Sequence, residues 1–128
     1  MANKEINEVR EGEKIKPIIL KDRDTGDTYT LEFNRDSVKF AEARGFDVDD
    51  VSRYPATKLE ELFFYAFRMH HQNVAREKTN RILWEKLGGL PEGFVERLTM
   101  LYMAPLEALK RAAEGSGEEK NASMTVEM

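Results

Sequence analysis

The sequence predicts an α+β protein that is mainly helical, with an N-terminal β-hairpin packed on a small bundle of about four helices. Residues 28–33 alternate apolar and polar side chains with the period of a half-buried strand. A helix signal follows at once, and apolar residues recur mostly at helical spacing through residues 34–113. With 128 residues, the chain is long enough for one domain with a modest core.

The chain divides into three parts. Residues 1–13 are polar and charged without hydrophobic period, which predicts a disordered arm. Residues 14–113 form the single globular domain, with the hairpin at 14–33 and the helices within 34–113. Residues 114–128 read as a flexible acidic linker with a short apolar tail, MTVEM, that is either disordered or a docking strand.

The hairpin has arms at residues 14–21 and 28–33, joined by the Asp- and Gly-rich turn DRDTGD. Pro17 cannot donate to a β-ladder, so the first arm is an edge strand or starts just after Pro17. An exposed edge is a template for pairing, which motivates a hypothesis of self-association into a homo-oligomer. The lysines at 14, 16 and 21 and Pro17 itself are also the residue types that blunt such an edge.

A tight strand-to-helix joint follows the hairpin. Asn34 is a good N-cap, and Gly45 is suited to the C′ position that ends the helix. Phe33 and Val38 stand at the N′ and N4 positions that a hydrophobic staple joins. A short turn or helical fragment is predicted over residues 47–54.

A long helix is predicted over residues 58–74. Thr57 and Glu60 match the capping box at its start. Its apolar face consists of Leu59, Leu62, Phe63, Ala66, Phe67, His70 and Val74. The pattern weakens at residues 74–80, which indicates a break or bend there.

Two further helices complete the domain. Ile82, Leu83, Trp84 and Leu87 predict a short amphipathic helix that Gly88 and Gly89 end. Pro91 suits the first turn of the last helix, and Pro105 predicts a kink or break inside it. The buried face of this helix is predicted to be Phe94, Val95, Leu98, Leu101, Tyr102, Leu109 and Ala112.

The residue types that form catalytic, cofactor and metal sites show no pattern that predicts a catalytic site, a cofactor or a metal. The chain has no cysteine. The adjacent His70 and His71 would point in different directions on a helix, so we do not expect them to bind one metal ion together. The acidic turn 22–27 lacks the ligand order of a calcium loop. Gly88-Gly89 lacks the surroundings of a phosphate-binding loop. We therefore expect a protein that is not an enzyme.

Charge and hydropathy bear on the class of partner. A net charge of −4 argues against nucleic acid, and no run of about 18 apolar residues is present to span a membrane. An alternative is a small helical DNA-binding or regulatory protein of a mobile element, because residues 76–81 (REKTNR) are locally basic. No helix-turn-helix spacing accompanies them.

Apolar residues outside the core faces are the positive indication of function. Phe64 and Tyr65 flank the apolar face of the long helix, and Met100 and Met103 lie opposite the core face of the last helix. Either these helices are buried nearly all round, or the residues form an adaptable protein-binding surface. The candidate protein-binding residues are Phe64, Tyr65, Met100, Met103, Met124, Val126 and Met128.

The chain from about residue 29 to residue 128 resembles the small tail assembly chaperones encoded by long-tailed phages and prophages of Gram-positive hosts. The resemblance rests on an extended YTLEFNR opening, a VKFAEARGF helix, an aromatic LFFYAF helix and an acidic linker with the apolar end MTVEM. Members of that family are mostly helical with a small β element.

The resemblance implies a non-enzymatic protein of the host cytoplasm that binds the tape measure protein. It also implies the tail tube protein as a second candidate partner. Such a chaperone keeps the tape measure protein soluble until the tail tube polymerises, and is absent from the mature virion. A minor structural virion protein is the alternative that differs only by remaining in the particle.

Overall fold

The computed structural model describes residues 15–114, with side chains through residue 108. In this part of the chain a two-stranded antiparallel hairpin is followed by four helices, so the protein is α+β and mainly α, as predicted. The elements in chain order are β1 (Ile18–Lys21), β2 (Thr28–Leu31), α2 (Arg35–Ala43), the 3₁₀ turn η1 (Val48–Asp50), α3 (Pro55–Phe67), α4 (Arg76–Arg81), the π-helical turn η2 (Ile82–Lys86) and α5 (Phe94–Glu114).

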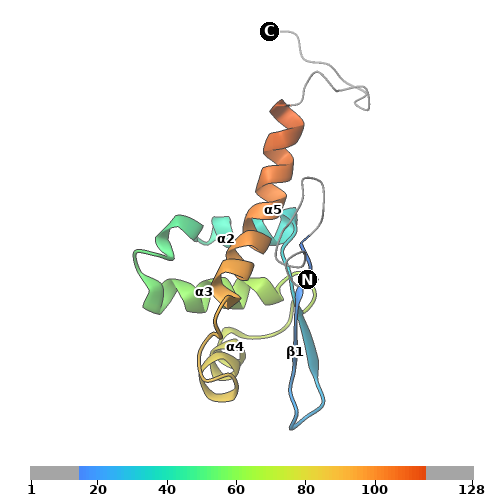
Figure 1. Ribbon diagram of the computed structural model, residues 1–128, viewed down its shortest axis with the longest axis vertical. Helices are drawn as coiled ribbons and strands as arrows, with labels where there is room; N and C mark the ends of the chain where they lie inside the picture. The colour runs from blue at the N-terminus through green and yellow to red at the C-terminus, as the bar shows by residue number, and fades with distance from the viewer. Residues whose placement is uncertain (1–14, 115–128) are drawn as a thin grey trace, which may run out of the picture.

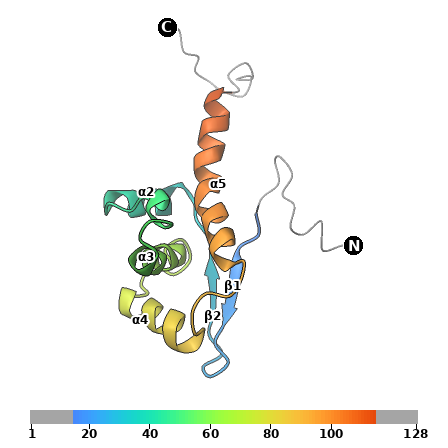
Figure 2. The ribbon, with the colours of Figure 1, turned by 60° about the vertical axis from the view of Figure 1, so that its left-hand side comes forward.

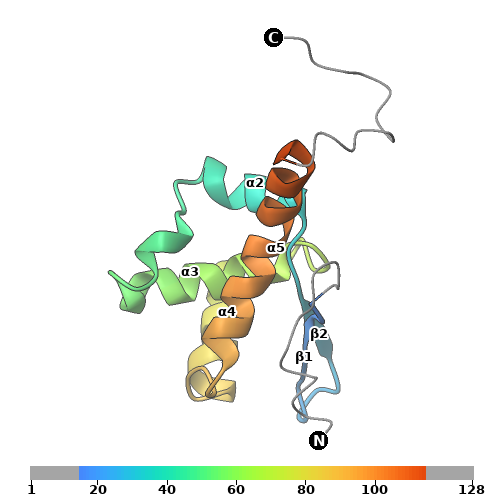
Figure 3. The same ribbon diagram turned by 45° about the horizontal axis from the view of Figure 1, so that its top comes forward.

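The hairpin stands beside the helices, with β2 nearer to α3 and β1 on the outer side (Figure 2). α3 crosses the direction in which α5 and the hairpin run, and α4 lies near the hairpin turn (Figure 1, Figure 2). The segment between α2 and α3 lies on the side away from the hairpin (Figure 3). The C-terminal part of α5 extends beyond the other elements (Figure 1).

β1 begins directly after Pro17, one of the two starts that the sequence predicts. Its register with β2 pairs Ile18 with Leu31 and Leu20 with Tyr29. These four side chains share one face, because residues two apart on a strand point the same way. Tyr29 and Leu31 are buried there, and the backbone N–H of Glu32 donates to the carbonyl of Ala66 on α3 at 3.0 Å. The hairpin is thereby joined to α3.

The core lies where β2, α2, α3, η2 and α5 meet. Its aromatic side chains pack mainly edge to face, which is a favourable geometry for their quadrupoles. The buried hydrophobic residues are Tyr29, Leu31, Phe33, Val38, Ala41, Phe46, Val51, Leu62, Phe63, Tyr65, Ala66, Phe67, Ile82, Leu83, Leu98, Leu101 and Tyr102.

The strand-to-helix joint forms as predicted. The Asn34 side chain accepts from the backbone N–H of Ser37 at 2.8 Å, and the Ser37 hydroxyl accepts from the backbone N–H of Asn34 at 2.9 Å. Phe33 and Val38 are both buried, and Gly45 follows α2 with a φ of 84°, a conformation that glycine adopts without strain.

Removing this reciprocal cap has a defined expected cost. Asn34→Ala should lower the free energy of unfolding by about 1 kcal/mol, because the N–H of Ser37 loses its acceptor at the start of α2. Urea unfolding of the two proteins measures the difference. The matched control is Asp36→Ala, an exposed first-turn residue that should change stability by less than about 0.5 kcal/mol.

The long helix differs from its prediction at both ends. α3 begins at Pro55, and Tyr54 at the N-cap makes no side-chain hydrogen bond, so the capping box at Thr57 and Glu60 is wrong. Proline has a φ suited to the first helical turn and needs no acceptor for an N–H there. The helix ends at Phe67 rather than at residue 74, and a turn follows in which the N–H of Arg68 donates to the carbonyl of Tyr65.

The short amphipathic segment becomes a π-helical turn. α4 leads directly into η2, where the N–H of Leu87 donates to the carbonyl of Ile82 at 2.8 Å. Gly88 and Gly89 have φ values of 71° and 106°, so they end this helical segment as predicted.

The last helix begins later and continues further than predicted. Pro91 lies in a turn before α5. Its carbonyl accepts from the backbone N–H of Phe94, the first residue of the helix. α5 then runs unbroken through Pro105, so of the predicted kink or break the break is wrong, and the kink stays a prediction. A proline removes one backbone hydrogen bond, and α5 is helical on both sides of Pro105 over its 21 residues. The predicted core residues Leu98, Leu101 and Tyr102 are buried, and Leu109 and Ala112 have no described side chains.

Candidate functional site

Tyr65, predicted as a protein-binding residue, is only 4% exposed. Its ring lies between Phe40 and Phe46, with centroid distances of 6.0 Å and 5.3 Å, and burial raises the pKa of its phenol. Phe40 on α2 and Phe46, three residues after the end of that helix, cover this flank of α3. The prediction of an exposed Tyr65 is therefore wrong, and this side chain belongs to the core.

Phe64 is half-buried on the other flank of α3. Its ring packs beside Tyr65 at a centroid distance of 5.2 Å, and the Arg76 guanidinium lies over it at 5.8 Å. Part of this ring is thus covered by the start of α4.

Of the predicted methionines, Met100 on α5 is 39% exposed, whereas Met103 is half-buried and packs against the core. Met124, Val126 and Met128 lie outside the described residues. Among the candidates whose side chains lie within residues 15–108, Met100 is therefore the exposed one.

Three other large hydrophobic residues are more exposed than Met100, and none of them is among the protein-binding candidates predicted from the sequence. Ile19 is 57% exposed on β1, Tyr54 is 58% exposed before α3, and Trp84 is 53% exposed on η2. The indole N–H of Trp84 donates to a Glu60 carboxylate oxygen at 2.8 Å. Trp84 is predicted with Ile82, Leu83 and Leu87 as part of an amphipathic α-helix, and in the π-helical turn it is exposed whereas Ile82 and Leu83 are buried.

The two histidines join the hairpin to the end of α3. The backbone N–H of Thr30 donates to Nε2 of His71 at 2.9 Å, and the His71 ring packs edge-on against Tyr29. Burial lowers the pKa of His71, with a smaller contribution from His70. Nε2 must be unprotonated to accept this hydrogen bond, so the structure uses neutral His71.

His70 instead points to the Glu32 carboxylate, with 2.9 Å between Nε2 and Oε1, and is an exposed residue. The prediction that His70 continues the core face is therefore wrong. α3 ends at Phe67, so helical spacing no longer determines which of the following residues faces inward. His71 takes the inward position.

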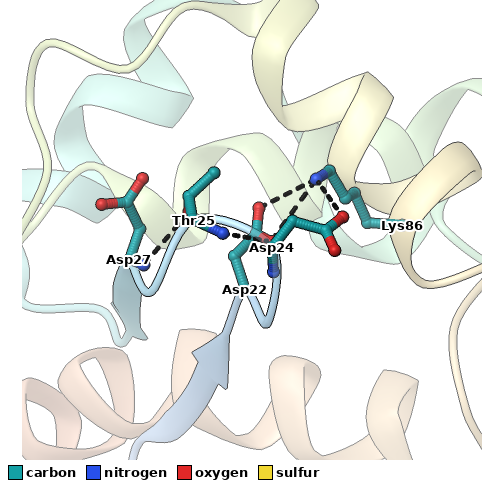
Figure 4. A network of polar contacts seen from close by, with 5 residues as sticks. All are labelled: Asp22, Asp24, Thr25, Asp27 and Lys86. Carbon is teal, nitrogen blue, oxygen red and sulfur yellow. Dashed lines mark hydrogen bonds and ion pairs between the residues drawn. The ribbon is translucent and has the colours of Figure 1, made fainter.

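The acidic turn is tied to η2 by Lys86 (Figure 4). Its ammonium lies 3.1 Å from an Asp22 oxygen and 3.3 Å from an Asp24 oxygen. The hydrogen bond from the Lys86 ammonium, followed by that from the backbone N–H of Asp24, lowers the pKa of Asp22. The carboxylates of Asp22 and Asp24 in turn raise the pKa of Lys86. Within residues 15–108, no group of three or more His, Asp or Glu side chains is placed to hold a metal ion.

A cavity of about 360 Å³ lies beside this tie, between the hairpin and η2. Its lining combines an apolar part with a rim of charged side chains. The lining residues are Leu20, Lys21, Asp22, Arg23, Asp24, Tyr29, Ile82, Lys86 and Leu87.

The basic segment considered for DNA binding is α4. Arg76 lies 3.8 Å from Glu60, and the Lys78 ammonium lies 5.8 Å from the ring centre of Tyr29. These cations therefore contact the protein's own side chains.

A protein family described as a domain of unknown function, DUF5055, matches residues 1–128 of this chain. The chain belongs to the DUF5055 family. Neither the curated proteins nor the solved structures contain a match. In the described part of this DUF5055 chain, no helix combines the length and apolar character that crossing a membrane requires.

Proposed function

We propose that this protein is a non-enzymatic phage tail assembly chaperone that binds the tape measure protein in the host cytoplasm. The proposal starts from the sequence resemblance described above. Its support from the geometry is an apolar residue, Met100, exposed on α5, the helix that extends beyond the rest of the fold (Figure 1).

The physical role suits such a surface. A tape measure protein is long, helical and apolar along its length, so it is prone to aggregate before tube subunits surround it. Methionine is flexible and polarizable, and it adapts to apolar partners of varied shape. A chaperone bound in this way covers the partner without covalent chemistry and leaves when tube subunits compete for the same surface. No nucleotide or cofactor is required.

Co-expression with the tape measure protein, followed by affinity purification, tests the proposal. The tape measure protein is expected to be soluble and to co-purify only when this chain is present. Met100→Ser should weaken the complex at least about tenfold, because the exposed apolar side chain proposed to contact the partner is lost. Tyr54→Ser is the matched control, since it removes a more exposed large side chain away from α5 and should leave binding unchanged.

A tape measure protein that is equally soluble alone and never co-purifies would refute the proposal. Mass spectrometry of purified particles separates the chaperone from a minor virion protein. The chaperone is expected to be absent from the finished virion, and its stoichiometric presence there would favour the structural role.

A further inference from the structure

The outer edge of β1 is open in the part of the chain that the structure describes. Along a strand of an antiparallel pair, the backbone N–H and C=O groups of one residue bond to the partner strand, and those of the next residue point away from it. The N–H of Asp22 donates to the carbonyl of Asp27 at 2.8 Å, which continues the register in which Leu20 pairs with Tyr29. The N–H and C=O groups of Ile19 and Lys21 therefore point away from β2.

The opposite edge of the hairpin is already occupied. The N–H of Thr30 donates to His71, and the N–H of Glu32 donates to Ala66. β1 thus presents the available edge, and Ile19 on it is 57% exposed.

The cavity adjoins this edge. Leu20 and Lys21 of β1 line it together with the apolar side chains of Ile82 and Leu87. A strand added to β1 would place alternate side chains on the same face as Leu20, because residues opposite one another in a sheet share a face. One of those side chains would lie beside the cavity.

The charge of the edge selects among partners. Lys16, Lys21 and Arg23 are exposed along it, and the Arg97 guanidinium donates to the carbonyl of Lys16 at 3.1 Å. The nearby Asp22 and Asp24 carboxylates face Lys86. The edge is therefore locally basic in a chain of net charge −4.

Pro17 disfavours pairing of the edge with a second copy of the chain. Antiparallel pairing centred on Ile19 would set Lys21 of one copy opposite Pro17 of the other, which has no N–H to donate. The same register sets Lys16 opposite Asp22, so the loss is a missing hydrogen bond and not like-charge repulsion. An acidic segment instead complements the edge.

We propose that the β1 edge binds an extended acidic polypeptide segment with apolar residues at alternate positions. The backbone of the segment pairs with Ile19 and Lys21, its carboxylates lie on the face of Lys21, near Arg23, and one apolar side chain enters the cavity on the face of Leu20. This inference holds whether or not the partner is a tape measure protein, so the two proposals fail separately.

The test titrates the full-length protein with the acetylated, amidated peptide Glu-Leu-Glu-Phe-Glu-Leu-Glu, followed by amide NMR. Shifts are expected to concentrate on Ile19, Lys21 and the cavity residue Leu87. N-methylation of the peptide amides that face β1 should abolish binding, whereas N-methylation of the alternate amides should not. A lysine-for-glutamate version of the peptide should not bind.

Variants of the protein localise the effect. Lys21→Glu combined with Arg23→Glu should weaken binding at least about tenfold, because two favourable charges are reversed. Lys39→Glu reverses an exposed charge on α2 and should weaken binding less than about twofold, as a surface charge distant from the edge. Circular dichroism checks that each variant stays folded.

Three results would overturn the inference. Binding that is insensitive to N-methylation means charge attraction without strand addition. Shifts centred outside β1 place the site elsewhere. A dimeric mass by light scattering, together with an amide chemical shift of Ile19 that changes on dilution without peptide, assigns the edge to a second copy.

Discussion

Phe63→Ala is expected to lower the free energy of unfolding by about 3–5 kcal/mol, a large fraction of the stability of a small domain. The Phe63 side chain is fully buried, and its ring packs against Phe67 at 5.1 Å and Phe94 at 6.1 Å. Truncation removes these contacts and leaves a cavity between α3 and the start of α5. Leu98→Ala, at an equally buried position on α5, should cost about 2–5 kcal/mol.

Chemical denaturation measures both losses. Met100→Ala is the matched control on the same helix, and its exposed side chain should change stability by less than about 0.5 kcal/mol. Phe64→Ala should fall between these limits, because Phe64 is half-buried under Arg76. A Phe63→Ala protein that unfolds at the wild-type denaturant concentration would contradict the packing of α3.

The second prediction is a loss of stability through His71 as the pH falls below 6.5, the ordinary histidine pKa. Burial lowers the pKa of His71 in the folded protein, so between 6.5 and this lowered value the unfolded chain binds more protons. The stabilising contribution is complete above 6.5 and is lost as the pH falls through that window. The charged or titratable groups nearby are Tyr29, His70, Glu32 and Lys78.

Denaturant unfolding over a pH series, with variants, isolates this contribution. His71→Gln should flatten the pH dependence, because an amide oxygen can accept from Thr30 without titrating. His71→Ala should cost about 1–3 kcal/mol, since the N–H of Thr30 loses its acceptor. The lowered pKa of Asp22 affects stability only at lower pH, because its stabilising contribution is lost as the pH falls below 3.8, the ordinary value. A wild-type curve that stays flat as the pH falls below 6.5 would disprove the role of neutral His71.

Some features of this fold were predictable because they depend on residues adjacent in the chain. The cap at Asn34, the stop at Gly45 and the turn before β2 arise from side chains and backbone within a few residues of one another. The same locality explains one error. Thr57 and Glu60 have capping-box spacing, but Pro55 starts the helix earlier, so both residues lie inside its first turns.

Other features required the whole fold. Tyr65 is buried because α2 lies against one flank of α3, and nothing adjacent to Tyr65 in the sequence indicates that cover. His71 rather than His70 faces the hairpin because α3 ends at Phe67. Trp84 is exposed because the turn that carries it is π-helical.

The sequence by itself determined the hairpin, the strand-to-helix joint and the helical character of the remainder, since hydrophobic period and caps act over one or two turns. Only the tertiary structure decided which flanks are covered, which edge of the hairpin is available, and that Lys86 ties the turn to η2 across more than sixty residues. Burial and pairing depend on segments that meet only on folding, because exposure is a property of what lies opposite a side chain and not of its neighbours in the chain.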